Sequence, residues 1–353
     1  MSAAEDRAET IRLIRDSAAA VAPPRGNLKR IRALRFHTPG FDPAVWRQIC
    51  ELGWPALHLP ESEGGSGLGM VEFCGLIEAL GAGLLPEPLI GGAMAARVLS
   101  SAHRTALLSG TAVILPAWQE RPHSLDPAGE TTLENGRISG TKRFVPMAAG
   151  ADAFVISARE GLALVQATAP GLRLATEPTQ DGGHFGTLHL DHAPAEPIPG
   201  RMAEAIEEGS LAIAAYLLGV MERAFALTLD YLKTRQQFGK PIGSFQVLQH
   251  RAADLQIQVA LSRASIESAA AIWDAGGPLP LRRAAVSRAK ARAAEAAMLV
   301  TRQAIQLHGG IGYTDEYDAG LYLRKAMVLA SLHGGADLHR ARFAALAPEQ
   351  DEE

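Results

Sequence analysis

The sequence predicts an α+β fold with an N-terminal helical domain in residues 1–110, a central antiparallel β domain in residues 111–200 and a C-terminal four-helix bundle in residues 201–353. Two observations lead to this prediction. The spacing of apolar residues changes from helical to strand-like near Thr111 and becomes helical again near Met202. Turn signals typical of β-hairpins lie between those two points.

The composition indicates a globular chain with a substantial core, since 47% of the 353 residues are hydrophobic and 20% are charged. Thirty-eight acidic residues against 34 basic ones give a net charge of −4, which argues against nucleic acid as a partner. Cys50 and Cys74 both lie in apolar helical segments, so we expect no disulfide framework.

Nothing in the sequence favours secretion or insertion into a membrane. Residues 1–15 alternate charged and apolar residues and lack the apolar core of a secretion signal. The longest apolar run, Leu211–Met221, is shorter than the roughly 18 residues of a membrane span. We therefore expect a cytoplasmic protein with no membrane partner.

The N-terminal domain is predicted to be helical because Phe41–Leu52 and Val71–Leu80 carry apolar residues at helical spacing. The glycine-rich segment between them has Met70 where a dinucleotide fingerprint starting at Gly65 needs a third glycine. Its acidic residues would also repel a pyrophosphate. We expect a loop that connects two helices.

The central domain is predicted from hairpin signals. Asn135–Gly136 and Glu160–Gly161 each lie between two extended segments, and two further strands follow at Leu172–Ala175 and Phe185–Leu190. Because strands joined by hairpins run antiparallel, we expect an antiparallel sheet structure. Three histidines gather near its end, but no cysteine accompanies them and we expect no metal site; they are His184, His189 and His192.

The C-terminal bundle is predicted from four apolar stretches that begin near Leu211, Leu248, Leu281 and Leu321. The first is apolar on nearly every side, so it predicts a helix in the middle of the bundle. It also suggests an oligomer, since no face of it suits water. The third stretch carries a basic cluster that we interpret as a solvated or subunit-facing surface, with a phosphate-binding surface as the alternative: Arg282, Arg283, Arg288, Lys290 and Arg292.

The segment from Tyr231 to Gln246 is predicted to contain a helix end, a loop with glycine and proline, and a new helix capped by Ser244. Such a junction can present the guanidinium of Arg235, the ring of Phe238 and backbone amides to a phosphate and a purine. An ordinary turn between two helices, with the aromatic ring as its plug, explains the same residues.

Several segments together resemble the acyl-CoA dehydrogenase family. Its C-terminal domain is similar to Arg235–Ile242, Phe245–Gln246, Ala304–Tyr313 and Leu323–Ala326. Its N-terminal helical domain is similar to Leu52-Gly53-Trp54 with Pro60-Glu61 and Gly64-Gly65, and its β domain to Ile138–Lys142 with Ala151-Asp152. The resemblance extends over nearly the whole chain and has the same order of helical and β parts.

The resemblance implies a flavoprotein of lipid or fatty acid catabolism that oxidises the α,β bond of an acyl-CoA thioester. In that reaction a carboxylate removes the α proton, FAD accepts the β hydrogen as hydride, and the electrons pass to an electron-transfer flavoprotein. It implies that Arg235, Gln237 and Phe238 contact the diphosphate and adenine of FAD. It further implies that the neighbouring subunit's flavin is served by Gln246, Gln306, Gly309 and Gly310.

Two departures from the family pattern concern the flavin ring. Leu115–Pro122 replaces the stretch of the Thr-Glu-Pro-x-x-Gly-Ser type that binds the ring in the family. Phe144-Val145-Pro146 replaces Trp-Ile-Thr, and Pro146 has neither the hydroxyl of the family's threonine nor an amide N–H.

A third departure concerns the catalytic base. Many members carry a glutamate in a Tyr-Glu-Gly-Thr-like turn, and His333 occupies its place here. The histidine is either a base or a surface residue without a task. Other members carry the glutamate on the first bundle helix, one residue from Glu208, which would point about 100° away around that helix.

The departures favour a chain that acts as the base-poor subunit of a heteromeric acyl-CoA dehydrogenase, together with a second subunit of the same family. The alternative is an active homo-oligomer that uses His333 or Glu208 as its base. A DNA-associated relative would need a basic surface, which the net charge argues against.

Overall fold

The computed structural model describes residues 3–23 and 25–347, which form two compact units. One unit combines the chain up to Leu28 with Met70–Leu85 and the chain from Leu211 onward. The other combines Lys29–Gly69 with Pro86–Ser210. Because the units interleave in sequence, they do not coincide with three consecutive domains.

Helix and strand succeed each other in the predicted order. The last N-terminal helix ends at Leu108, strands run from Ile114 to Ile198, and the chain is mainly helical from Met202 on. The domain boundaries at 110 and 200 stay predictions. The outer ends of the first and third predicted domains, residues 1–2 and 348–353, lie outside the described residues.

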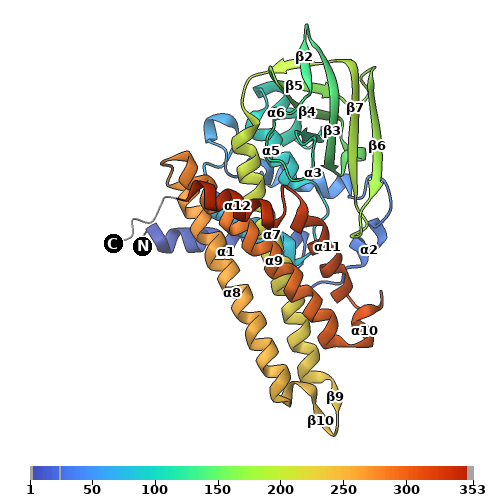
Figure 1. Cartoon of the computed structure of the whole chain (residues 1–353), viewed down its shortest axis with the longest axis vertical. Coiled ribbons are helices and arrows are strands. Elements are labelled where there is room, and N and C mark those ends of the chain that lie inside the picture. The colour runs from blue at the N-terminus through green and yellow to red at the C-terminus, as the bar shows by residue number, and fades with distance from the viewer. Residues whose placement is uncertain (1–2, 24, 348–353) are drawn as a thin grey trace. The chain divides into compact units, whose positions relative to one another are not determined.

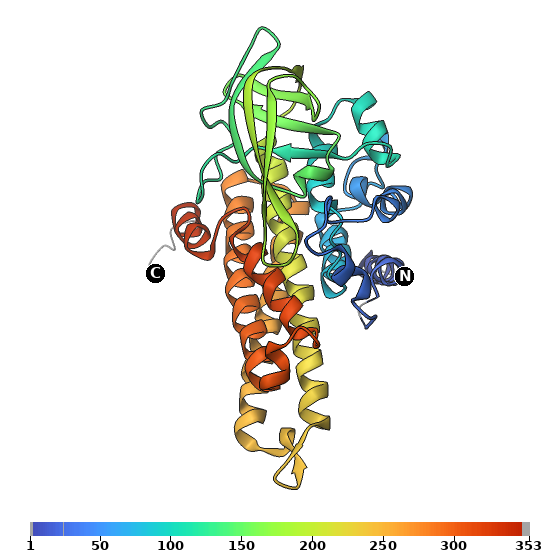
Figure 2. The same ribbon diagram turned by 90° about the vertical axis from the view of Figure 1, so that its right-hand side faces the viewer.

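The first unit is built from helices. Its elements are α1 (Ala3–Val21), α4 (Met70–Ala82), most of α7 (Met202–Thr234), β9 (Gln236–Gln237), β10 (Lys240–Pro241), η4 (Ile242–Ser244), α8 (Gln246–Asp274), α9 (Leu279–His308), α10 (Gly310–Tyr313), α11 (Ala319–Ser331) and α12 (Ala336–Leu346). Helix α9 packs against α8, α11 and α12, and α8 and α9 run alongside each other (Figures 1 and 2). The four predicted bundle helices are present, and α12 is an additional helix that the apolar pattern does not predict.

Helix α7 is apolar because most of its surface is buried within the chain. It is long and apolar enough to cross a membrane by length and composition, but 78% of its apolar 18-residue window is buried in the structure. Residues Glu207–Met221 are all buried. The helix is therefore a core helix, and its apolar surface no longer requires a second subunit to cover it.

Helix α4 is held against α7 at two glycines. A Cβ atom on Gly81 would clash with the carbonyl group of Tyr216, and one on Gly219 would clash with the carbonyl oxygen of Glu78. The backbones can approach this closely because neither glycine has a side chain. Two tyrosine hydroxyls then satisfy carbonyls at and just after the end of α4: Tyr216 donates to Leu85 O at 2.8 Å and Tyr322 to Ala82 O at 2.9 Å.

The basic cluster on α9 is only partly the solvated surface that its composition suggests. Lys290 is fully buried, which contradicts that interpretation. The guanidinium carbon of Arg282 lies 3.8 Å from the ring centroid of Trp273, and Arg292 donates to Gln258 Oε1 at 2.6 Å. Arg288 is exposed and donates to Ser268 Oγ at 3.0 Å. Charge counting cannot separate these cases, because each side chain finds its partner on another part of the unit.

The second unit combines short helices with strands. Its helices are α2 (Lys29–Leu34), α3 (Pro43–Glu51), η1 (Trp54–Ala56), η2 (Glu61–Glu63), α5 (Leu89–Val98), α6 (Ser101–Leu108), η3 (Ala148–Gly150) and the start of α7. Its strands are β1 (Ile114–Ala117), β2 (Thr132–Glu134), β3 (Arg137–Pro146), β4 (Ala153–Ala158), β5 (Gly161–Gln166), β6 (Leu172–Pro178), β7 (His184–Pro194) and β8 (Glu196–Ile198).

The strands form one sheet in the order β1-β4-β5-β8 and another in the order β2-β3-β7-β6. Alternate residues of β4 point to opposite faces. Phe154 and Ile156 share a core with Leu188 of β7, while Val155 packs in a second core with residues of α5 and the start of α7, such as Met94 and Ile206. The first sheet is therefore covered on both faces.

The predicted hairpins are present, and the antiparallel prediction holds except for one strand pair. Asn135 and Gly136 both adopt positive φ between β2 and β3, and Gly161 does so as the first residue of β5. Strands β1 and β4, however, run parallel, with Ile114 opposite Ala153. The hairpin argument misses this pair because β2 and β3, which belong to the other sheet, separate the two strands in sequence.

A cluster of charges joins four helices of the first unit. Arg263 of α8 contacts Glu78 of α4 at 2.7 Å and Glu222 of α7 at 2.5 Å, and Arg15 of α1 contacts Glu78 at 3.0 Å. Burial and the neighbouring Glu78 raise the pKa of Glu222, and Arg263 opposes that rise. Glu222 therefore depends on the guanidinium of Arg263, whereas Glu78 is also held by Arg15.

We expect Arg263→Met to lower the free energy of unfolding by about 1–3 kcal/mol at neutral pH, because the partly buried Glu222 loses this ion-pair partner and Glu78 keeps only Arg15. A carboxyl whose pKa is raised in the folded state binds its proton more tightly there, so its contribution is lost as pH rises through that pKa. The deficit should thus be larger at pH 7.5 than at pH 5, as measured by chemical denaturation. Arg288→Met, at an exposed site, is the matched control; an equal deficit at both pH values would contradict the prediction.

Candidate functional site

The end of α7 turns back into α8 through a small hairpin, visible at the tip of the two helices in Figure 1. Gln237 pairs with Lys240 in antiparallel register, and the tip residues Phe238 and Gly239 both have positive φ. The Ile242 amide donates to Arg235 O at 2.8 Å. The predicted cap of α8 is wrong: the helix starts at Gln246, and Ser244 Oγ instead donates to Pro241 O at 2.7 Å.

Helix α9 ends at a glycine pair. Gly309 follows its last residue, His308, with φ 64° and ψ −142°. A Cβ atom built on either Gly309 or Gly310 would meet no other atom within 4 Å. The backbone of this turn therefore faces open space, so that a ligand can come close to it.

The hairpin and the glycine pair line one cavity of about 560 Å³. Five of the residues singled out in the sequence meet there although about 75 positions separate them: Arg235, Gln237, Gln306, Gly309 and Gly310. The other lining residues are Tyr231, Ile242, Leu248, Arg251, Leu307, His308 and Ile311. Phe238 and Gln246 do not line it.

Arg251 is a cavity residue that the sequence analysis misses. It lies on α8 three positions after Leu248, which also lines the cavity, so the two share a helix face. That spacing is the signal that could have identified it. With Arg235 it gives the cavity two guanidinium groups, which suit a diphosphate.

Phe238 lies outside the cavity at the exposed tip of the hairpin. Its side chain is 89% exposed, and its ring meets that of Phe245 edge to face at 6.1 Å. Lys240 Nζ lies 4.5 Å from the centroid of the Phe245 ring. Phe238 is therefore no plug between α7 and α8, and an exposed aromatic ring remains available to a ligand or a partner.

His308, the residue before the Gly309–Gly310 turn, is held by contacts with two tyrosine rings. Its ring lies 4.5 Å from that of Tyr231 and 4.6 Å from that of Tyr317, and its Nδ1 contacts Ala304 O at 2.7 Å. Because a carbonyl only accepts, Nδ1 carries a proton. Burial lowers the pKa of His308, so the ring is neutral at physiological pH. These two ring contacts hold His308 in place, and with it the backbone position from which Gly309 follows.

The cavity fits the diphosphate and adenosine part of FAD by its chemistry. It offers two guanidinium groups, amide side chains and an uncovered glycine backbone. Its volume lies within the range of small-molecule sites, about 300–1,000 Å³.

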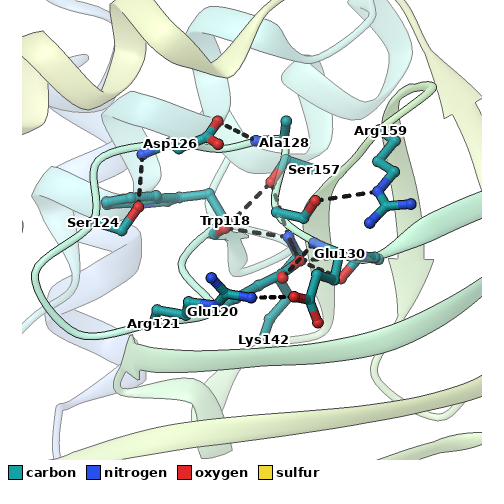
Figure 3. Close-up of polar contacts among 12 residues, drawn as sticks. Trp118, Glu120, Arg121, Ser124, Asp126, Ala128, Glu130, Lys142, Ser157 and Arg159 are labelled. Atoms are coloured by element: carbon teal, nitrogen blue, oxygen red, sulfur yellow. Dashed lines mark hydrogen bonds and ion pairs between the residues drawn. The ribbon is translucent and has the colours of Figure 1, made fainter.

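The segment Leu115–Pro122, which replaces the ring-binding stretch of the family, contributes Glu120 to an ion pair with Lys142. Glu120 Oε1 accepts from Lys142 Nζ at 2.7 Å and from Thr131 Oγ1 at 2.6 Å, and Glu120 Oε2 accepts from the Glu130 amide (Figure 3). Lys142 is fully buried and also donates to Trp118 O at 3.2 Å. Burial opposes ionisation, but the hydrogen bonds from Lys142 and Thr131 outweigh it and lower the pKa of Glu120 to about 2.

The residues at the second departure from the family pattern also offer little to a flavin ring. Pro146 ends β3 and has no N–H or O–H donor. Phe144 has a positive φ of 59° at an irregularity in the β3–β7 pairing, and its ring meets that of Phe185 edge to face at 6.3 Å. At position 146 the β part therefore lacks the hydroxyl donor of the family pattern.

His333 lies in the turn between α11 and α12 and is buried, with 6% of its surface exposed. The alternative that it is a surface residue is therefore wrong. Its φ is 56°, in the left-handed region, and its carbonyl accepts a hydrogen bond from His339 Nε2 at 2.9 Å.

Glu208 is also buried, at the start of α7. Its Oε2 lies 3.4 Å from His58 Nε2 and 3.4 Å from Arg97 Nε. The carboxylate thus makes ion-pair contacts within its own unit. Among the residues that the structure describes, there is no group of three or more candidate ligands that could hold a metal ion.

Comparison with family models matches both helical parts of the chain. The model "Acyl-CoA dehydrogenase, C-terminal domain" matches residues 200–346, and "Acyl-CoA dehydrogenase, N-terminal domain" matches residues 8–102. The acyl-CoA dehydrogenase IpdE2 of Mycolicibacterium smegmatis is 33% identical over 335 residues, covering 92% of this chain and 93% of the relative. IpdE2 of Mycobacterium tuberculosis is 30% identical over 341 residues, covering 94% and 93%.

Solved structures have the same fold. A chain of the Tcur3481-Tcur3483 steroid acyl-CoA dehydrogenase is 30% identical with a TM-score of 0.87, covering 96% of this chain and 98% of its own. A chain of the ChsE4-ChsE5 complex from Mycobacterium tuberculosis is 26% identical with a TM-score of 0.87, covering 97% and 98%. With both family domains matched and relatives this similar over almost its whole length, the chain belongs to the acyl-CoA dehydrogenase family and is an FAD-dependent oxidoreductase or a subunit of one.

Proposed function

We propose that the chain is the base-poor subunit of a heteromeric acyl-CoA dehydrogenase that oxidises the α,β bond of an acyl-CoA thioester. The observation that carries the proposal is a difference between two places in the chain. One cavity collects Arg235, Gln237 and the Gly309–Gly310 turn, which suit the adenosine diphosphate end of FAD. The place expected to bind the flavin ring holds Pro146 and a Glu120–Lys142 ion pair instead.

In this proposal the chain binds and orients the cofactor. Arg235 and Arg251 hold the diphosphate by charge-assisted hydrogen bonds, and the backbone at Gly309 and Gly310 approaches it closely. Gln237 and Gln306 supply amide groups, and Phe238 and Gln246 extend the same surface toward adenine. FAD accepts the β hydrogen of the substrate as hydride when bound. The partner subunit contributes the base that removes the α proton.

Two similar solved structures support the heteromeric arrangement and suggest a first substrate to test. The ChsE4-ChsE5 structure is described as a complex of two differently named proteins, and the other similar structure as a steroid enzyme. We therefore propose a second acyl-CoA dehydrogenase-like subunit as partner and a steroid-type acyl-CoA thioester as the first substrate. An electron-transfer flavoprotein would reoxidise the cofactor, and the assembly would act in the cytoplasm.

The second candidate function is an active homo-oligomer whose base is His333 or Glu208. The buried place of His333 in the turn between α11 and α12 favours it over Glu208. The carboxylate of Glu208 is instead engaged by Arg97, at 3.4 Å. His333 is thus the residue to test first.

We expect Arg235→Ala to lower the affinity of the assembled enzyme for FAD by about 10- to 150-fold, because the charge-assisted contact to the diphosphate is lost. Arg251→Ala should act in the same direction. Flavin content after gel filtration, followed by titration with FAD, measures the effect. Arg288→Ala, which removes an equal charge outside the cavity, should keep wild-type affinity, and full flavin content in both cavity variants would contradict the assignment.

We expect the purified chain alone to lack the visible absorption bands of a flavin, and the bands to appear when it is purified with its partner subunit. The physical reason is that the chain holds one end of FAD, while Pro146 lacks the donor that the family pattern places beside the ring. Light scattering should give the mass of an assembly that contains both subunits. A chain that is yellow, oligomeric and active without a partner would favour the homo-oligomer.

We expect His333→Ala to change turnover of the assembled enzyme by less than about twofold, since the partner provides the base. If His333 is the base, the same change costs about 100-fold or more in turnover while flavin is retained. Glu208→Gln serves as the comparison: it removes one of the two carboxylates that Arg97 contacts, while Glu204 remains, and should lower thermal stability without lowering turnover. Acyl-CoA-dependent reduction of the flavin distinguishes the outcomes.

A further inference from the structure

Lys290 is a buried cation that the proposed function does not use. It lies on α9, is fully buried, and its Nζ donates to three carbonyl oxygens: Leu329 O at 3.2 Å, Ala330 O at 3.0 Å and Gly334 O at 3.1 Å. Two of these carbonyls belong to the last turn of α11, where a helix leaves its carbonyls without partners. The third belongs to the turn that follows.

An ammonium group suits these three acceptors better than a neutral amine. It has three N–H donors, one for each carbonyl, whereas the amine has two. Burial lowers the pKa of Lys290 to about 7. Only the charged form can donate to all three carbonyls at once. Burying an ammonium group is unfavourable, and its hydrogen bonds to the three carbonyls offset that cost.

His339 of α12 holds the neighbouring carbonyl. Its Nε2 lies 2.9 Å from His333 O, and because a carbonyl only accepts, Nε2 carries a proton. Its Nδ1 lies 3.2 Å from Ser287 Oγ on α9. Burial lowers the pKa of His339 to about 4, and the charge of Lys290 adds to this, so the ring is neutral and its Nδ1 accepts from the serine hydroxyl. The ring therefore has a defined tautomer and orientation.

The turn between these two residues has a conformation that needs support. His333 and Gly334 have φ values of 56° and 95°, both in the left-handed region, and a residue with a side chain adopts that region at a cost of about 1 kcal/mol. The Gly334 amide donates to Ser331 O at 3.1 Å, which closes the turn from inside. The carbonyls of His333 and Gly334 are consecutive, and each is held by a buried side chain from another helix.

We propose that Lys290 and His339 are positioning residues that fix the His333–Gly334 turn in one conformation by holding its two consecutive carbonyls. The turn stands at the place where the family resemblance puts the catalytic base. In a homo-oligomer the two residues would orient the His333 ring; in the base-poor subunit they keep the turn in its folded shape. The proposal is thus independent of which subunit provides the base.

The experiment uses the full chain, with its partner subunit where the assembly requires it. Hydrogen exchange of the backbone amides of residues 333–336 is compared in the wild type, Lys290→Met, His339→Leu and His339→Gln. Histidine labelled with ¹³C reports the environment of the His333 ring, whose signal is identified by its loss in His333→Gln. Arg288→Met, on the exposed face of α9, is the control.

Lys290→Met and His339→Leu should speed exchange at Gly334 by roughly 10- to 100-fold and shift the His333 signal, while amides in the middle of α8 keep their protection. His339→Gln should restore slow exchange, since its amide N–H can replace the Nε2 proton. A purely structural role predicts loss of protection along α9, α11 and α12 alike and no rescue by glutamine. That result, or an unshifted His333 signal, would overturn the proposal, and the histidine variants decide it even if Lys290→Met does not fold.

Discussion

The close contact between α4 and α7 is the constraint on which the helical unit depends. Gly81 and Gly219 have no side chains, so the two backbones approach until a Cβ atom on either would clash with a carbonyl group of the other helix. Once α4 is there, Tyr216 and Tyr322 can reach the carbonyls at its end, and Glu78 faces Arg263. Burial of apolar surface alone would permit many arrangements of these helices, whereas the glycines and the polar contacts select one.

This constraint also explains why local patterns predict the fold class better than the organisation into units. The order of helix, strand and helix follows from apolar periodicity, and Asn135–Gly136 predicts a hairpin through its own conformational preferences. Assignment of Met70–Leu85 to the same unit as the bundle depends on contacts across more than a hundred positions. The parallel β1–β4 pair is likewise a contact between strands that are distant in sequence. Periodicity carries no information about such pairs.

The candidate sites divide in the same way. Motif resemblance singles out Arg235 and Gly309, and the fold brings both to one cavity, but periodicity alone could not have joined α7 to the end of α9. Arg251 escapes the sequence analysis because one arginine on a polar helix face resembles any solvated residue. The sequence analysis also misses the burial of Lys290. Its neighbours Arg288 and Arg292 suggest a solvent-exposed surface, but Lys290 lies on the buried face of the helix.

Buried charge is placed differently in the two units, and that difference bears on function. In the β part, Lys142 meets the carboxylate of Glu120, and Thr131 and the Glu130 amide complete a network that needs no ligand. On α9, Lys290 meets carbonyls instead of a carboxylate, so its charge stabilises backbone conformation at a turn. In the cavity at Arg235, the glycine backbone faces open space and the surroundings suit an anion. The two buried lysines thus find their partners within the protein, whereas Arg235 and Arg251 line a cavity whose surroundings suit an anion.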